Sequence, residues 1–278
     1  MSLLEISFAR QPQYLFMLLM FLLLAITAIA APLRAQTATI STAPAYSSAA
    51  VVNSATNTAN ALAPNAIASI YGTNLSFDTQ AASRISPLSY MLPDTLAGVR
   101  VYVAGVEASL YYVSPRQINF LIPNLRAGDM SLYVTRQGVT GQHVTITVHD
   151  AGPGLYQGSP GMIASTHADG SVITEEHPAR PGEIVVLYGT GLGHTDPDAV
   201  SGEISMTPAQ ITQLCQFHVS VAGTVLDRSN VHYAGVTPGI PGLYQVNVKL
   251  PDHLPRDPEI GIGIADSFSP AGLKLAVR

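Results

Sequence analysis

The chain has 278 residues, enough for one or two domains, and combines 47% hydrophobic residues with only 11% charged residues. Its formal net charge is −5 and it shows no basic stripe of the kind that holds phosphates, so nucleic acid is not expected as a partner. The one cysteine, Cys215, excludes a disulfide within the chain. We expect it to be a small buried apolar side chain, with pairing between chains as the alternative.

The N-terminus is an apolar segment. Residues 14–31 carry no charge, Arg10 precedes them, and small residues follow as far as Ala35. This pattern predicts that residues 1–35 form a secretory signal peptide, or an uncleaved membrane-anchor helix. In both cases the rest of the chain is expected to be exported, and to be secreted, periplasmic or on the cell surface. Residues 36–50, rich in Ala, Thr and Ser, are expected to form a flexible leader.

Two similar runs organise the rest of the sequence. Pro64-Asn-Ala-Ile-Ala-Ser-Ile-Tyr-Gly-Thr-Asn-Leu75 recurs 117 residues later as Pro181-Gly-Glu-Ile-Val-Val-Leu-Tyr-Gly-Thr-Gly-Leu192. Self-similarity at a long spacing predicts a duplicated unit. Each run is expected to form a turn led by proline, an apolar strand and a Gly-Thr turn.

The first copy is predicted to span residues 51–149. Short segments with alternating apolar residues predict strands at 51–53, 67–71, 98–105, 107–113, 117–122, 130–135 and 144–148. Residues 107–113 are expected to return as the partner of 98–105, and residues 76–95 are expected to form a long loop. About seven short strands in about 100 residues is the size and rhythm of an immunoglobulin-like sandwich.

The second copy is predicted to span residues 150–278, after a hinge at Ala151-Gly-Pro-Gly154. Strands are expected at 162–165, 171–174, 184–188, 217–223, 245–250, 260–264 and 273–277. Residues 194–213 are expected to form a long loop. The Gly/Pro-rich segment Ala234–Gly242 has no counterpart in the first copy and is predicted to form an inserted loop.

Three segments resemble a known family. They are Tyr112–Phe120, Pro181–Gly193 and Ala234–Val248, and they resemble the uncharacterised C-terminal domain of secreted acidobacterial (Solibacter-type) proteins. That domain is itself similar to tandem IPT/TIG-type immunoglobulin-like folds. The resemblance covers about residues 50–278, implies the fold and export, and brings no catalytic residues. We therefore expect an all-β chain of two tandem immunoglobulin-like β-sandwiches after the N-terminal signal or anchor helix.

Two loops contain residues of the types found in binding sites. Gly189–Gly193 follows a predicted strand as in dinucleotide-binding loops, but His194-Thr-Asp-Pro-Asp198 follows it without a helical period, so nucleotide binding is not expected. His194, Asp196, Asp198 and Glu203 are candidate cation ligands. Because their spacing fits no strict motif, we expect an acidic solvated loop and no metal or other cofactor.

Hydrolase chemistry is not expected from His167 and Asp169. They lie two residues apart in a predicted turn, and the Gly-x-Ser-x-Gly elbow that a nucleophilic serine requires is absent from the sequence. Tyr71 and Tyr188 end equivalent strands, and we expect both rings to pack at the end of a sheet rather than to serve as an exposed platform.

Paired amides recur in the two copies. Gln117 and Asn119 in the first and Gln245 and Asn247 in the second lie on the faces of their strands that point away from the core. We expect these amides to bind neighbouring loop backbone, with ligand recognition as the alternative.

The sequence as a whole predicts a non-enzymatic exported module with a structural, adhesive or protein-interaction role. Its expected partner is an unidentified extracellular protein or polysaccharide, and it would meet the membrane only through an uncleaved N-terminal segment. The alternative is a carbohydrate-binding module that uses the inserted loop with Tyr233 or Tyr244, although the chain has no Trp. A third hypothesis is a calcium-stabilised domain that uses Asp196, Asp198 and Glu203.

Overall fold

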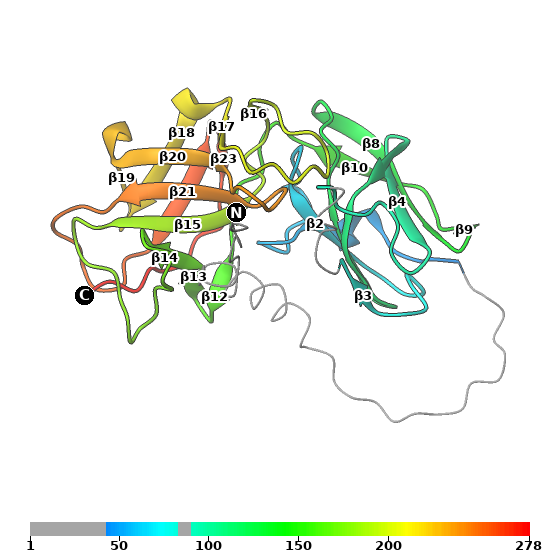
Figure 1. Ribbon diagram of the computed structural model, residues 1–278, viewed down its shortest axis with the longest axis horizontal. Coiled ribbons are helices and arrows are strands. Elements are labelled where there is room, and N and C mark those ends of the chain that lie inside the picture. The colour runs from blue at the N-terminus through cyan, green and yellow to red at the C-terminus, as the bar shows by residue number, and fades with distance from the viewer. Residues whose placement is uncertain (1–42, 83–89) are drawn as a thin grey trace, which may run out of the picture.

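The structure is a computed structural model that describes residues 43–82 and 90–278, and this part of the chain is all-β (Figure 1). Its helical segments are single 3-10 turns at Ser48–Ala50, Leu214–Gln216 and Arg228–Asn230. The strands form two groups of sheets, which lie side by side along the long axis of the molecule. The expected fold, two tandem immunoglobulin-like sandwiches, is confirmed. The predicted signal or anchor segment, at residues 1–35, lies outside the described residues.

The first sandwich packs two five-stranded antiparallel sheets against each other. The order of the first sheet is β1 (Val51–Asn53), β2 (Ile67–Tyr71), β7 (Gln117–Leu121), β6 (Leu110–Val113), β3 (Gln80–Ala81). The order of the second is β10 (Val144–Val148), β8 (Gly128–Arg136), β4 (Val99–Val103), β5 (Val106–Ala108), with β9 (Val139–Thr140) also paired to β8. Alternate residues such as Ile118 and Phe120 are fully buried between the sheets.

The second sandwich repeats this plan with additions. The order of its larger sheet is β11 (Gly154–Leu155), β15 (Ile184–Thr190), β21 (Tyr244–Lys249), β20 (Val231–Val236), β17 (Ala209–Ile211), β16 (Thr195–Asp196), with β14 (Ser165–His167) also on β15. The order of its smaller sheet is β19 (Thr224–Val225), β18 (Phe217–Val221), β22 (Ile260–Ile264), β23 (Ser267–Phe268). β12 (Gln157–Ser159) and β13 (Met162–Ile163) form a separate hairpin. No helix in the described residues is long and apolar enough to span a membrane.

The two sandwiches share the same strand order, as the sequence repeat predicts. The series β2-β7-β6 recurs as β15-β21-β20, and β8-β4-β5 recurs as β22-β18-β19. The hairpins β4–β5 and β18–β19 both close on an Ala-Gly pair, at Ala104-Gly105 and Ala222-Gly223, with positive φ at both residues. Two positive φ angles define the type I′ turn, whose twist matches that of the flanking strands. The sequence echo therefore marks equivalent turns.

The glycine of each Tyr-Gly-Thr run admits a neighbouring backbone. A Cβ on Gly72 would collide with the carbonyl oxygen of Ala45, and one on Gly189 would meet the carbonyl oxygen of Gly154. In each copy the chain passes alongside the run and pairs with it, at Ala45 with Thr73 and at Gly154 with Thr190. Close approach of two backbones thus explains why both copies have glycine there.

Five local predictions were wrong in detail. The predicted strand at 107–113 is two strands, β5 and β6, because the chain crosses from one sheet to the other at Ser109. The predicted inserted loop begins late, since β20 continues to Val236. Residues 273–277 form only isolated bridges, and the two predicted long loops contain the short strands β3, β16 and β17.

Candidate functional site

The linker between the sandwiches is packed, so the predicted hinge at Ala151–Gly154 is wrong. Residues 151–156 are all buried. The side-chain amide of Asn53 donates to the Gly152 carbonyl over 3.0 Å, and the Gly152 N–H donates to the Gly191 carbonyl over 2.8 Å. A Cβ on Gly152 would meet the backbone of Ala61. The glycine that suggested flexibility is needed for close packing.

One buried hydroxyl joins both sandwiches. Thr190 Oγ1, at the end of β15, accepts from the N–H of Ile67 over 2.9 Å and donates to the carbonyl of Gly242 over 2.7 Å. Gly242 has φ +72, and a Cβ there would collide with the side chains of Ile67 and Leu121 in the first sandwich. The Tyr111 hydroxyl donates to the Pro241 carbonyl. The C-terminal end of the inserted loop therefore packs tightly against β2 and β7.

An apolar cluster lies beside this hydroxyl. Tyr156, Ala164, Tyr188 and Leu243 are each at most 5% exposed, and Ala55 of the first sandwich packs against them. The Tyr156 hydroxyl lies 2.6 Å from Ser54 Oγ, again across the boundary. Burial of both apolar and hydrogen-bonded groups makes this a stabilising contact rather than a loose one.

The long loop of the second sandwich, at residues 194–213, makes a second contact with the first sandwich. Asn124 in the first sandwich donates its N–H to Ser201 Oγ over 2.7 Å and its side-chain amide to the Ala199 carbonyl over 2.8 Å. The backbone pairs as well, through Leu92 N–H to the Gly202 carbonyl over 2.8 Å. We name these two contacts together, around Thr190 and around Asn124, the seam.

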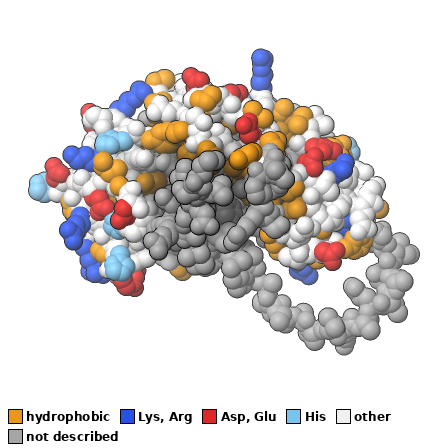
Figure 2. Space-filling model, viewed as in Figure 1, with side chains coloured by type: hydrophobic (Ala, Val, Ile, Leu, Met, Phe, Trp, Pro, Cys, Tyr) orange, Lys and Arg blue, Asp and Glu red, His pale blue; other side chains and the backbone are white. Residues whose placement is uncertain are grey.

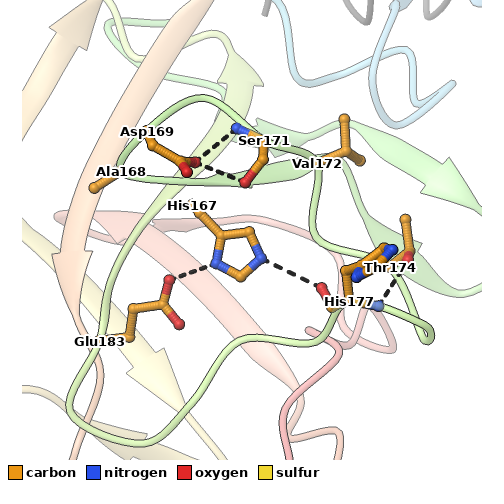
Figure 3. A pocket seen from close by; sticks show the side chains of 8 residues that line it. All are labelled: His167, Ala168, Asp169, Ser171, Val172, Thr174, His177 and Glu183. Carbon is orange, nitrogen blue, oxygen red and sulfur yellow. Dashed lines mark hydrogen bonds and ion pairs between the residues drawn. The ribbon is translucent and has the colours of Figure 1, made fainter. Parts of the chain in front are cut away.

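A shallow hollow lies on the second sandwich, away from the seam (Figure 3). His167 stands at its centre, with Glu183 Oε1 at 2.5 Å from Nδ1 and the His177 carbonyl at 3.3 Å from Nε2. Asp169 accepts from the N–H and the hydroxyl of Ser171, and these hydrogen bonds lower the pKa of the Asp169 carboxyl. Since both nitrogens of His167 face oxygen acceptors, neither is aimed at Ser171. The arrangement organises a turn and gives no nucleophile–base pair.

The predicted sugar-binding tyrosines are not exposed platforms. Tyr244 is fully buried and its hydroxyl donates to the Gly193 carbonyl; burial raises the pKa of this tyrosine. Tyr233 is half-buried and its hydroxyl donates to the carbonyl of Ala209 over 3.1 Å, beside Gly235. Because stacking on a sugar needs a free ring face, the loop 234–242 cannot bind a glycan through Tyr244 in this fold.

The candidate cation ligands lie apart. His194 Nδ1 is 3.4 Å from Asp198 Oδ1, while Glu203 lies near Met91, with which its backbone forms an isolated bridge. Asp196, Asp198 and Glu203 are all exposed. Within residues 43–82 and 90–278, no three His, Cys, Asp or Glu side chains are grouped so as to hold a metal ion.

The repeated amides bind each other rather than loop backbone, which corrects the prediction. Gln117 donates to Asn119 Oδ1 over 2.8 Å, Ser69 also donates to that oxygen over 2.9 Å, and Gln245 donates to Asn247 Oδ1 over 3.2 Å. They form short polar ladders on the outer sheet faces. The alternation that placed them there was read correctly, but their partners lie on the same and adjacent strands.

Two further expectations fail at single residues. Cys215 is exposed rather than buried, because it lies in the 3-10 turn before β18 instead of on a core-facing strand position. Tyr71 is 39% exposed, whereas its counterpart Tyr188 is 5% exposed as expected. The seam buries Tyr188 and leaves Tyr71 partly exposed.

The surface carries charges of both signs. On the face drawn in Figure 2, acidic and basic side chains are interspersed over both sandwiches. An aromatic row that the sequence analysis did not single out lies on the outer face of the sheet that contains β4 and β8. It consists of Tyr102, Tyr133 and His143, with successive ring centroids 4.6 and 4.3 Å apart. Only the spacing of aromatic residues on adjacent strands could have indicated it.

Known proteins give distant likenesses. No family model and no curated protein matches the chain. Similar solved structures include a surface glycan-binding protein from Prevotella bryantii (11% identity, 78% of this chain and 38% of that one, TM-score 0.27). They also include a mixed-linkage glucan utilization locus SGBP-B from Bacteroides ovatus (10%, 79% and 43%, TM-score 0.31) and the tandem Ig repeats of Dlar (13%, 78% and 91%, TM-score 0.20). The chain spans less than half the length of the first two. Likenesses this distant carry no argument about function.

Proposed function

We propose that the chain is an exported, non-enzymatic module in which two immunoglobulin-like sandwiches act as one rigid unit that presents its outer faces to an extracellular partner. The observation that carries the proposal is the seam, above all the buried Thr190 hydroxyl shared by both sandwiches.

A rigid unit follows from the cost of opening the seam. Separation would expose the apolar cluster around Tyr188 and break hydrogen bonds whose donors are buried. Breaking a buried hydrogen bond without a replacement costs about 1–3 kcal/mol for each group left unsatisfied. A unit whose two halves are already oriented loses less entropy when a partner contacts both of them.

The rigidity is tested by a distance between the sandwiches. Spin labels on the exposed Cys215 and on Val106→Cys, which is 41% exposed in the native chain, report one pair by pulsed electron resonance. We expect one narrow distance distribution, and a broader one when Thr190→Val and Asn53→Ala are added. A broad distribution in the native background would contradict the rigid unit.

Export and the absence of turnover are tested separately. Residues 1–50 fused before a phosphatase that is active only outside the cytoplasm should give activity, and replacing two leucines of residues 14–31 by arginine should remove it. Turnover of any substrate on a broad hydrolase panel that disappears in His167→Ala would overturn the non-enzymatic proposal.

A further inference from the structure

Strand β22 has glycine at both of its outward positions. Ile260, Ile262 and Ile264 point into the core, while Gly261 and Gly263 lie opposite Ser220 and His218 of β18. The register of this pair runs from Phe217/Ile264 to Val221/Ile260 without a shift, so the glycines do not mark a bulge. A Cβ on Gly263 would collide with the His218 ring, and one on Gly261 would meet Ser220 Oγ. The two glycines therefore make room for side chains of β18, and they leave the outer face of β22 without side chains of its own.

The equivalent surface of the first sandwich, on β4 and β8, carries aromatic side chains. Because Ala104-Gly105 and Ala222-Gly223 are equivalent turns, Tyr102 corresponds to Ser220, and their cross-strand partners Tyr133 and Gly261 also correspond. Tyr102 and Tyr133 stack with their rings 4.6 Å apart and 11° from parallel, so they cover each other. In the second sandwich Ser220 and Gly261 replace these two tyrosines, and a hollow of about 360 Å³ lies where the rings would be.

The lining combines one aromatic ring with hydroxyls and a carboxylate. Phe268 on β23 is 63% exposed, and its ring centroid lies 5.3 Å from that of His218 at an angle of 58°. Ser269 Oγ accepts from the N–H of Ile262 over 3.0 Å, which leaves its own proton to donate. Glu259 uses Oε1 to accept from the Gly272 N–H over 2.9 Å, so its second oxygen remains to accept.

We propose that this hollow is a subsite for one neutral sugar unit of an oligosaccharide. The Phe268 ring, which is largely exposed, suits the C–H face of a pyranose. Ser220 and Ser269 supply donors and Glu259 an acceptor, as a polyol requires. The lining, which lies within the described residues, holds a carboxylate and no Lys or Arg, so a phosphate or an acidic peptide is disfavoured. A single aromatic ring makes no cage for a quaternary ammonium group.

This inference deepens the proposed function by naming a partner class, and it rests on that function only in that the partner is extracellular. The subsite differs from the Tyr233 and Tyr244 loop, because it lies on the smaller sheet of the second sandwich rather than at the seam. Sugar binding can fail while export and rigidity hold, and the reverse is also true.

The test is affinity electrophoresis of the full chain, in mild detergent, through gels that contain a β-glucan, a xylan, a galactomannan or an α-glucan. We expect at least one polysaccharide to retard the native chain. Phe268→Ala should weaken that binding about tenfold, the effect expected for loss of one stacking contact. Gly261→Tyr with Ser220→Tyr, which installs the tyrosine pair of the first sandwich, should abolish it by filling the hollow.

The matched control is Tyr90→Ala, which removes a similarly exposed aromatic side chain (59%) from the first sandwich and should leave retardation unchanged. Circular dichroism of each variant checks that it is folded. Retardation by none of the four polysaccharides would overturn the subsite. Retardation that persists both in Phe268→Ala and in the double tyrosine variant would also overturn it. A third contrary result would come from NMR, if the amide signals of Gly261 and Ser269 shifted on adding tetramethylammonium and did not shift on adding sugar.

Discussion

Tyr71 and Tyr188 occupy the same position in the two copies and meet opposite surroundings. Tyr71 is 39% exposed and its hydroxyl donates to Asn57 over 3.1 Å, whereas Tyr188 is 5% exposed, 3.3 Å from the Thr166 hydroxyl and packed on Tyr156 and Leu243. A strand pattern is local, so it assigns both rings to the end of a sheet. Tyr188 is covered by residues of the seam that lie far from it in the sequence, so the local pattern does not predict its burial.

The pair supplies a prediction with its own control. Tyr188→Ala should lower the free energy of unfolding by about 3–5 kcal/mol, because a buried aromatic side chain is lost and a cavity remains. Tyr71→Ala should cost less than about 1 kcal/mol, since much of that ring already contacts water. Denaturation in guanidinium chloride, followed by far-UV circular dichroism, measures both. Equal losses would show that the two environments do not differ as described.

At the scale of the element, alternation and turn residues were sufficient where a strand stays in one sheet. The predicted bounds of β2, β10 and β22 match the structure, because each has an apolar run closed by turn residues. Residues 107–113 were predicted as one strand because the change of sheet at Ser109 leaves the apolar pattern almost unbroken. The inserted loop was placed only roughly, since Gly235 pairs within β20 despite its composition.

The two Ala-Gly hairpins give a prediction that tests their equivalence. Ala104 and Ala222 both have φ +50, where an L-residue with a Cβ is strained and asparagine is tolerated. Ala104→Asn and Ala222→Asn should each raise the free energy of unfolding, by about 0.5–1 kcal/mol. Thermal and chemical unfolding check this, with Ala→Val at the same sites expected to destabilise. A gain in one copy and a loss in the other would contradict the equivalence of the turns.

At the scale of the whole molecule, buried tyrosines predict loss of stability in alkali. Burial raises the pKa of Tyr46 to about 12, although a hydrogen bond from the Val134 N–H lowers it in part, and burial also raises the pKa of Tyr156 and Tyr244. In the unfolded chain these groups titrate near pH 10. Above that pH the unfolded chain releases protons that the folded chain keeps, so the stability present below about pH 10 falls as the pH rises.

Denaturation midpoints between about pH 8 and pH 11.5 measure this loss. Tyr156→Phe should make the decline shallower, because one buried phenol no longer resists ionisation, although it also removes the contact with Ser54. A free energy of unfolding that stays constant across this range would contradict the burial of these side chains.

The seam was beyond sequence analysis because its partners are far apart in the chain and its residue types are ordinary. Thr190 and Ile67 are separated by 123 positions, and Thr190 was read only as part of a turn. The same glycines and prolines that mark a flexible linker also permit the closest packing, so composition alone predicted a hinge at Ala151–Gly154. Long-range pairing decides between the two outcomes.

Loss of the Thr190 hydroxyl should therefore destabilise the contact between the two sandwiches. Thr190→Val keeps the shape of the side chain but leaves the buried N–H of Ile67 without its acceptor, which should cost about 1–3 kcal/mol of stability. Thr190→Ser keeps the hydroxyl and should cost about 1 kcal/mol or less.

We expect the native chain to unfold in one transition, with tyrosine fluorescence and circular dichroism coinciding. In Thr190→Val combined with Asn53→Ala, which removes the amide that holds Gly152, the transition should broaden or divide in two. Two transitions in the native chain, or equal stability of the valine and serine variants, would mean that the sandwiches fold independently and that this hydroxyl does not join them.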